Sequence, residues 1–265
     1  MTTENPYMKS IHTAVREQFS QHANYYAQSS AHATGDTLDL ILDFAEPKGT
    51  EQTLDVATGT GFTAFKFAPK VSHVIATDLT PEMVAKAAEL AQEKEIKNID
   101  FSVAAAESLP VADASLDLVT CRIAPHHFQD VPAFLSEVHR ILRTDGLFCM
   151  VDSVCPESEK LIAWQNRIEK LRDNSHVYGR PPSEWDAMIT DAGFSLEKTA
   201  HVRNAQMSFR WWVRPKENPP EVVQEIREGF TNLSPDEAKE HYTVDPAGDD
   251  FYFSWPMYAV KARRM

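Results

Sequence analysis

The chain has 265 residues, 43% of them hydrophobic, which is enough for one large α/β domain with a sizeable core. Its formal net charge of −13 disfavours direct binding to a nucleic-acid backbone. No apolar run approaches the ~20 residues of a membrane span, and the polar start of the sequence does not resemble a signal peptide. Three cysteines without C-x-x-C spacing favour the cytoplasm and offer no metal site.

The first elements predicted are two helices that precede the main domain. Apolar residues recur near every fourth position at Ile11, Val15, Phe19 and Tyr26, which is typical of one face of an amphipathic helix. A second helix is predicted from Asp36 to a stop before Pro47. We expect residues 1–46 to pack beside the domain that follows, or to cover it as a lid.

A glycine-containing turn follows the first predicted strand. In the segment TLDVATGTG (residues 53–61), Leu54 and Val56 have strand spacing, and the chain then turns through Gly59 and Gly61 into a helix that stops at Pro69. Glycines allow a tight turn and let a ligand approach the main chain. The order of strand, glycine turn and helix predicts a nucleotide-binding corner.

An acidic residue supports this interpretation. Residues 71–77 predict a second strand ending at Asp78, roughly 20 residues after the glycines, where a carboxylate can bind two ribose hydroxyls. Thr80 and Pro81 begin the next helix, as its N-cap and first-turn residue.

Strands and helices alternate through the rest of the chain. Further strands are predicted at residues 99–104, 116–122, 147–153, 194–204 and 251–259. Helices are predicted at residues 81–95, from Asp130 onward, at 157–171, and from a Ser183 N-cap to Gly193. The fold class expected is α/β: a Rossmann-like sheet of seven mostly parallel strands with helices on both faces. One domain, 1–265, would comprise N-terminal lid helices (1–46), a cofactor-binding core (47–155), insert helices (156–193), and the last strands (194–265) with a helical cap at about 205–248.

Five segments resemble the class I S-adenosylmethionine-dependent methyltransferases: LDVATGTG, ATDLTPEMV, AAAESLPVADASLDLV, APHHFQDV and EVHRILRTDGLF. They span about residues 51–153, and the likeness is strongest to the ubiquinone/menaquinone C-methyltransferase branch and related small bacterial methyltransferases. The chain departs at Ala57, where many members have glycine. It also lacks an asparagine-proline-proline-aromatic motif after the fourth strand, which argues against adenine or amide N-methylation.

The resemblance implies S-adenosyl-L-methionine as the cofactor and a role for each matching residue. Gly59 and Gly61 would approach its methionine part, Asp55 would bind the amino group directly or through water, and Asp78 would bind the ribose. The implied cofactor-binding set is Tyr25, Asp55, Ala57, Thr58, Gly59, Gly61, Asp78, Leu79, Met83, Ala106, Glu107, Arg122 and His127.

Methyl transfer depends mainly on alignment, and a base is needed only when the acceptor must lose a proton. The candidates are His126, His127, Asp152 and His176. The first two follow the fourth strand and Asp152 ends the fifth, so all three lie at the carboxyl edge of the sheet, where ligands of such folds bind. We assign His127 to the cofactor side and His126 to the acceptor side.

The acceptor expected is a small aromatic or apolar molecule, methylated on carbon or oxygen. Its pocket would draw on the N-terminal helices and the late insert, from Phe19, Tyr25, Tyr26, Tyr178, Trp211 and Trp212, with Trp164 assigned to the core. Two alternatives stay open: a cofactor-binding protein of this fold that does not methylate, and a NAD-dependent dehydrogenase. The sequence also leaves a homodimer open.

Overall fold

The computed structural model describes residues 6–20, 22–23, 27, 36–213 and 218–265. Its main sheet has seven strands in the order β3-β2-β1-β4-β5-β10-β6. Only β10 runs antiparallel to its neighbours in this sheet, so the predicted mostly parallel sheet is confirmed. The strands are β1 (Gln52–Val56), β2 (His73–Asp78), β3 (Ile99–Val103), β4 (Leu116–Arg122), β5 (Leu142–Ser153), β6 (Phe194–Arg203) and β10 (Pro256–Arg264).

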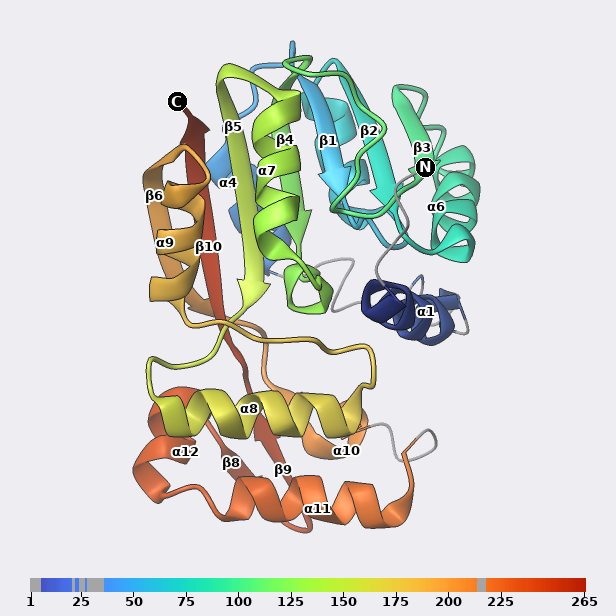
Figure 1. Cartoon of the computed structure of the whole chain (residues 1–265). Coiled ribbons are helices and arrows are strands. Elements are labelled where there is room, and N and C mark those ends of the chain that lie inside the picture. Colours follow the sequence, from blue (N-terminus) through green and yellow to red (C-terminus); the bar gives the residue numbers. More distant parts are fainter. Residues whose placement is uncertain (1–5, 21, 24–26, 28–35, 214–217) are drawn as a thin grey trace.

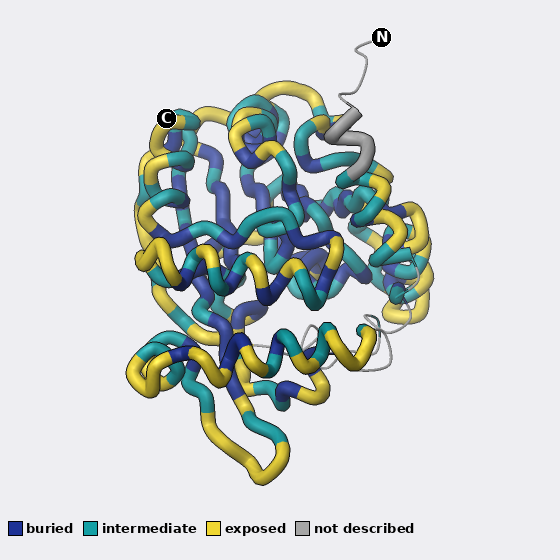
Figure 2. Tube along the Cα trace, turned by 60° about the horizontal axis from the view of Figure 1, so that its bottom comes forward, coloured by how far each residue is buried: buried dark blue, intermediate teal, exposed yellow. Residues whose placement is uncertain are grey.

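Helices cover both faces of this sheet, and each face has its own apolar core (Figure 1). The helices α4 (Asp36–Ala45) and α5 (Phe62–Phe67) pack on one face, while α7 (Val131–Ile141) and α9 (Pro182–Asp191) pack on the other. A sheet enclosed in this way needs strands that are apolar on both sides. The central strands meet this need, and buried residues follow them through the middle of the molecule (Figure 2).

Two further helices lie near β2 and β3. The helix α6 (Pro81–Glu93) contacts β2 and β3, and α1 (Pro6–Ser20) contacts α6. Figure 1 shows α1 between the main sheet and a second lobe. None of the described helices combines the length and the apolar character needed to cross a bilayer.

The second lobe is a cap with a core of its own. It contains α8 (Glu159–Arg172), α10 (Phe209–Val213), α11 (Pro220–Thr231) and α12 (Pro235–Tyr242). It also contains an antiparallel sheet of three short strands, β7 (Met207–Ser208), β8 (Asp245–Ala247) and β9 (Asp250–Phe253), in the order β7-β9-β8. Its centre is aromatic, with edge-to-face and tilted rings from Trp164, Trp212, Phe230, Phe253 and Trp255.

The prediction of a single last strand over residues 251–259 is wrong. Two strands occupy this segment: β9 ends at Phe253 in the cap, and β10 begins at Pro256 in the main sheet. The alternation of Phe251, Phe253 and Trp255 reflects burial in the core of the cap instead of burial against the main sheet.

Two other predicted boundaries also differ. Ser183 is not the N-cap of α9, because the helix begins at Pro182 and Pro181 precedes it. The Ser183 hydroxyl instead donates to Oε2 of Glu157 at 2.6 Å. The fifth strand begins at Leu142 instead of residue 147, with Asp145 at a positive φ of 62° within it.

Candidate active site

A cleft lies between the carboxyl ends of β1, β2 and β4 and the cap, and α1 forms part of its wall. It brings together the glycine turn, Asp78, the two histidines after β4 and the end of α8. These segments are far apart in the sequence. They meet because parallel strands end at the same edge and the cap lies beyond that edge.

The glycine turn between β1 and α5 has left-handed backbone at three positions. Ala57, Gly59 and Gly61 have φ values of 54°, 56° and 93°. A residue with a side chain does not fit at position 61, because a Cβ on Gly61 would lie 2.5 Å from the Phe65 ring. A Cβ on Gly59 would meet no heavy atom of the described residues within 4 Å. The open space beside Gly59 is therefore part of the cleft, as expected where a ligand approaches the backbone.

Asp78 is held at the tip of β2 by main-chain donors. Its Oδ2 accepts from the N–H of Gly59 at 2.8 Å, and its Oδ1 accepts from the N–H of Thr80 at 2.9 Å. Burial raises the pKa of Asp78, and these hydrogen bonds oppose that shift. A carboxylate can accept about four hydrogen bonds. Asp78 lines the cleft with acceptor capacity left for hydroxyl groups.

Asp55 is buried in β1 and is not among the described residues that line the cleft. Its Oδ2 accepts from the Thr58 hydroxyl at 2.6 Å, and its Oδ1 accepts from the Thr120 hydroxyl at 2.8 Å. Burial raises the pKa of Asp55 to about 6 against these hydrogen bonds. Asp55 adjoins the cleft through Thr58, which does line it.

The wall expected for the adenine is formed by Leu79, Met83 and Ala106, which all line the cleft with Glu107. Nε2 of His12, from α1, lies 3.7 Å from Oε2 of Glu107. Burial raises the pKa of Glu107, but the hydrogen bond and charge of His12, with backbone hydrogen bonds, outweigh it and leave the pKa below its ordinary value. This contact joins α1 to the wall of the cleft.

Arg122, the last residue of β4, also lines the cleft. Its Nε donates to the Thr63 hydroxyl at 3.0 Å and its Nη1 to the Thr37 hydroxyl at 3.2 Å. The side chain thereby joins α5, α4 and the end of β4. Burial lowers the pKa of Arg122, and the charge of Asp55 opposes that shift.

His126 and Asp152 form a pair across the ends of β4 and β5. Nδ1 of His126 lies 2.7 Å from Oδ1 of Asp152, and the backbone N–H of His126 donates to Oδ2 at 2.8 Å. Burial lowers the pKa of His126, but the charge and hydrogen bond of Asp152 raise it and outweigh burial, so the pKa lies above its ordinary value. Asp152 is fully buried, whereas His126 lines the cleft.

His127 lines the cleft beside His126, with ring centroids 4.2 Å apart. Its Nδ1 lies 3.0 Å from the carbonyl oxygen of Ser175, so this nitrogen carries the proton. Burial, together with the charge of His126, lowers the pKa of His127 to about 4. Phe19 of α1 meets the ring edge to face at 5.2 Å.

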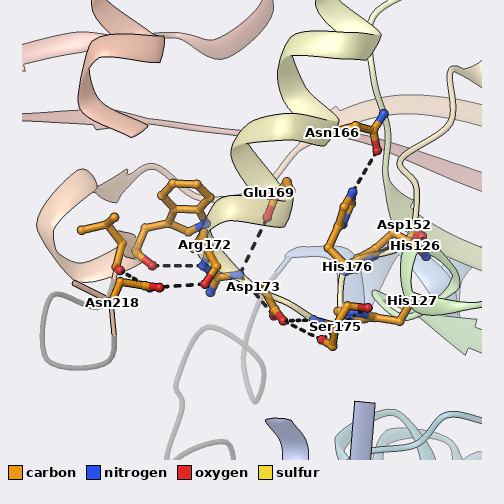
Figure 3. A network of polar contacts seen from close by, with 12 residues as sticks. His126, His127, Asp152, Asn166, Glu169, Arg172, Asp173, Ser175, His176 and Asn218 are labelled. Atoms are coloured by element: carbon orange, nitrogen blue, oxygen red, sulfur yellow. Dashed lines mark hydrogen bonds and ion pairs between the residues drawn. The ribbon is translucent and has the colours of Figure 1, made fainter. Parts of the chain in front are cut away.

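His176 is not among the described residues that line the cleft. It is 3% exposed, and its Nε2 lies 2.9 Å from Oδ1 of Asn166. Its ring lies 5.8 Å from the ring of His126, on the side of the cap (Figure 3). Burial lowers the pKa of His176 strongly. In this arrangement His176 packs behind His126.

A family model described as a methyltransferase domain matches residues 54–150. The Bacillus subtilis protein YcgJ, described as an uncharacterized methyltransferase, is 36% identical over 230 residues, covering 85% of this chain and 88% of YcgJ. The chain is a class I S-adenosylmethionine-dependent methyltransferase. A crystal structure of YcgJ matches it with a TM-score of 0.79 at 32% identity, over 86% of this chain and 97% of that chain.

More distant relatives match this methyltransferase at lower coverage or lower identity. The ubiquinone/menaquinone biosynthesis C-methyltransferase UbiE of Dinoroseobacter shibae is 31% identical over 118 residues, 43% of this chain and 47% of UbiE. Geranyl diphosphate C-methyltransferase from Streptomyces coelicolor, solved with S-adenosyl-L-homocysteine, shares the fold with a TM-score of 0.62 at 12% identity, over 100% of this chain and 86% of that chain.

The residues of the cleft fit the cofactor of this family. Gly59 leaves open space at the turn, Asp78 offers acceptors to hydroxyl groups, and Leu79 and Met83 supply an apolar wall. Tyr25, also assigned to the cofactor, lies outside the described residues. No group of three or more described histidine, cysteine or acidic residues is placed to hold a metal ion.

The aromatic residues at the cleft are fewer than expected. Phe19 and Trp211 line the cleft, Trp164 belongs to the core of the cap as predicted, and Trp212 lies in that core instead of lining the cleft. Tyr178 is not among the described lining residues, and Tyr26 lies outside the described part of the chain. Arg172 and Asp173 line the cleft without having been predicted. No sequence signal distinguishes them from ordinary charged residues at a helix end.

Proposed function

We propose that this methyltransferase acts on carbon or oxygen of a small, planar, largely apolar acceptor, and that His126 accepts the acceptor's proton. One observation carries the proposal: the His126–Asp152 pair opens onto the same cleft as Asp78 and the glycine turn. A base in that position is useful to a phenol or an activated carbon, which must lose a proton as the methyl group arrives.

The pair has the geometry and the pKa that a base requires. Asp152 accepts at Oδ1 from Nδ1 of His126, so Nε2 is the nitrogen left to take a proton. Asp152 also accepts from the backbone N–H of Ser153 at 2.9 Å, which fixes its carboxylate. A base works best when its pKa is near the working pH, and Asp152 shifts the pKa of His126 upward toward that range.

The neighbouring His127 supports this role by staying neutral. With a pKa of about 4, it adds no positive charge beside His126 near neutral pH. Two adjacent histidines whose pKa values are pushed apart indicate different roles. His127 then serves to position ligands, with Nδ1 fixed by Ser175 and the ring held against Phe19.

When bound, S-adenosylmethionine supplies a methyl group on a positively charged sulfur, which is a good leaving group. The chain's own residues then have three tasks. Asp78 and the glycine turn orient the donor, Phe19 and Trp211 form aromatic walls for a flat acceptor, and His126 takes the proton. α1 and the cap line the cleft from two sides.

The test is methylation of phenols and β-diketones with labelled S-adenosylmethionine, followed as formation of S-adenosylhomocysteine. His126→Asn is expected to lower the rate by roughly a hundredfold or more, the range for loss of a general base. His73→Asn is the matched control, because His73 forms a 3.1 Å contact with Asp100 outside the cleft. Methylation of amines alone, or an undiminished rate in His126→Asn, would overturn the proposal.

The second outcome, cofactor binding without methyl transfer, is considered because a protein of the same fold is described as a cyclase. The [4+2]-cyclase SpnF matches this chain with a TM-score of 0.59 at 19% identity, over 86% of this chain and 79% of that chain. Binding of S-adenosylmethionine with no S-adenosylhomocysteine formed from any acceptor class would point to such a non-methylating use of the site.

A further inference from the structure

The cap presents an arginine and a tryptophan to the acceptor side of the cleft. Arg172 ends α8, Trp211 lies in α10, and both line the cleft. Trp211 is 48% exposed, which is unusual for so large an apolar side chain. Any inference about their role concerns the acceptor and rests on the function proposed above.

The guanidinium of Arg172 is fixed in place. Its Nε donates to the carbonyl oxygen of Trp212 at 3.1 Å, and its Cζ lies 5.1 Å from the centroid of the Trp212 ring. The Asn218 side chain donates to the Arg172 carbonyl oxygen at 3.3 Å, as Figure 3 shows. The Arg172 side chain is only 15% exposed. A planar donor group held in this way loses little freedom on binding a ligand.

The charge of Arg172 faces two carboxylates, but among the described residues the donors on its Nη1 and Nη2 have no acceptor. Nη1 lies 3.8 Å from Oε2 of Glu169 and 3.9 Å from Oδ2 of Asp173, distances at which charges interact but hydrogen bonds do not form. The other oxygen of Asp173 accepts from the hydroxyl and backbone N–H of Ser175. Within the described part of the chain, no atom accepts a hydrogen bond from Nη1 or Nη2 of Arg172.

The combination of free Nη donors and a neighbouring carboxylate favours one kind of ligand group. Unused donors at a largely buried site favour a ligand that supplies an acceptor. A carboxylate would bring a further negative charge beside Asp173, which lines the cleft with Arg172, and an ammonium group has no acceptor to offer. An uncharged oxygen, best a carbonyl, meets both conditions, and the exposed ring of Trp211 suits a flat neighbour.

We propose that Arg172 and Trp211 determine acceptor specificity, and that they select planar molecules bearing an uncharged carbonyl oxygen. Arg172 donates to that oxygen while Trp211 stacks on the ring system. The simpler view is that Arg172 only stabilises the end of α8 and packs on Trp212. A binding experiment separates the two views, because a purely structural arginine does not distinguish ligands by one oxygen atom.

The experiment measures binding of three naphthalene probes by equilibrium dialysis, with the enzyme saturated with S-adenosylhomocysteine. Acetylnaphthalene carries the carbonyl, ethylnaphthalene has nearly the same shape without oxygen, and naphthoate carries a charge. The wild type is expected to bind acetylnaphthalene roughly tenfold more tightly than either other probe. Arg172→Lys keeps the charge but not the planar donors, and should remove the preference over ethylnaphthalene.

Two further variants complete the design. Trp211→Ala should weaken the binding of all three probes by a similar factor, because stacking does not depend on the oxygen. Arg227→Lys is the matched control, since Arg227 lies 4.5 Å over the Phe209 ring in the cap and is not among the described lining residues. Unchanged melting temperatures would show that each variant folds.

An acetyl-to-ethyl ratio that is the same in the wild type and Arg172→Lys would overturn the assignment. Tightest binding of naphthoate would also overturn it, in favour of an anion site. The result is independent of methyl transfer, because none of the three probes needs to react. Loss of methyl transfer in His126→Asn is read from S-adenosylhomocysteine formation, whereas the acetyl-to-ethyl ratio is read by dialysis in the wild type and Arg172→Lys, so a failure of this inference is distinguishable from a failure of the proposed function.

Discussion

The backbone N–H of Gly59 donates to Oδ2 of Asp78 at 2.8 Å, joining the turn after β1 to the tip of β2. The carboxylate therefore cannot move independently of the backbone that a ligand approaches. Thr80 holds the other oxygen from the far side at 2.9 Å. The two positions assigned to the cofactor are thus joined directly, and we expect this to favour binding because little has to be ordered when the cofactor arrives.

The first prediction concerns the open space at Gly59. Gly59→Ala should lower the free energy of unfolding by only about 1 kcal/mol, the cost of a left-handed alanine, since no described atom opposes the new methyl group. It should weaken binding of S-adenosylhomocysteine roughly tenfold or more, because the methyl group occupies the cleft. Urea unfolding and calorimetry measure the two effects.

Gly248→Ala is the control for that variant. Gly248 has a φ of 65° and equally open surroundings, but it lies between β8 and β9 in the cap. The two variants should lose similar stability, whereas Gly248→Ala should bind as the wild type does. Equal affinity in both variants would mean that the turn does not contact the cofactor.

The second prediction concerns pH. His126 must be neutral to accept a proton, so kcat/KM should rise with pH through its pKa, which Asp152 holds above the ordinary 6.5. In Asp152→Asn the charge that raises this pKa is lost while burial, which lowers it, remains. The midpoint of the rise should therefore move to lower pH, and the maximal rate should fall by roughly tenfold or more. Rate profiles between pH 5 and 9 provide the measurement.

Asp100→Asn is the matched variant, since Asp100 pairs with His73 in the same way at an exposed position. Its profile should coincide with that of the wild type. If the midpoint stays in place in Asp152→Asn, a group other than His126 controls the reaction.

The third prediction concerns acid stability. The folded protein holds the pKa of His127 near 4, whereas the unfolded chain takes up the proton near 6.5. Stability from this group is therefore present above pH 6.5 and declines as pH falls toward 4. Between pH 7 and pH 5 it should contribute a loss of about 2 kcal/mol, at 1.36 kcal/mol per pH unit. His127→Gln should remove this part of the decline in urea unfolding.

His201→Gln, at an exposed position on β6, should leave the decline as it is in the wild type. An identical pH dependence for His127→Gln and the wild type would show that His127 has the same pKa in the folded and unfolded states, contrary to the effect of its burial beside His126.

Local pattern was enough to predict the parallel strands of the sheet and several residues that line the cleft. The apolar strand before Gly59 and the acidic residue at the end of β2 depend only on neighbours in sequence, and both lie where the pattern indicated. The same rule placed His126 and Asp152 at one edge, at the ends of adjacent parallel strands, but the contact between them was not predicted. These features are set by the sheet itself.

The acceptor side could not be predicted in the same way, because it depends on how the cap packs. The alternating aromatics of residues 251–255 fit a strand in either lobe, and only the aromatic core around Trp212 decides which. Arg172 is a common residue for a helix end, and its role follows from contacts with Trp212 and Asp173, which no spacing reveals. Long-range packing decided these positions.

The most direct test of the account is the affinity of Asp78→Ala for S-adenosylhomocysteine, measured by calorimetry against Asp100→Ala. Asp78 lines the cleft at the end of β2, whereas Asp100 is an exposed acidic residue on β3. Loss of charge-assisted hydrogen bonds of about 1.5–3 kcal/mol predicts at least roughly tenfold weaker binding in Asp78→Ala. Asp100→Ala should bind as the wild type does. Unchanged affinity in a folded Asp78→Ala protein would contradict the assignment of this cleft to the cofactor.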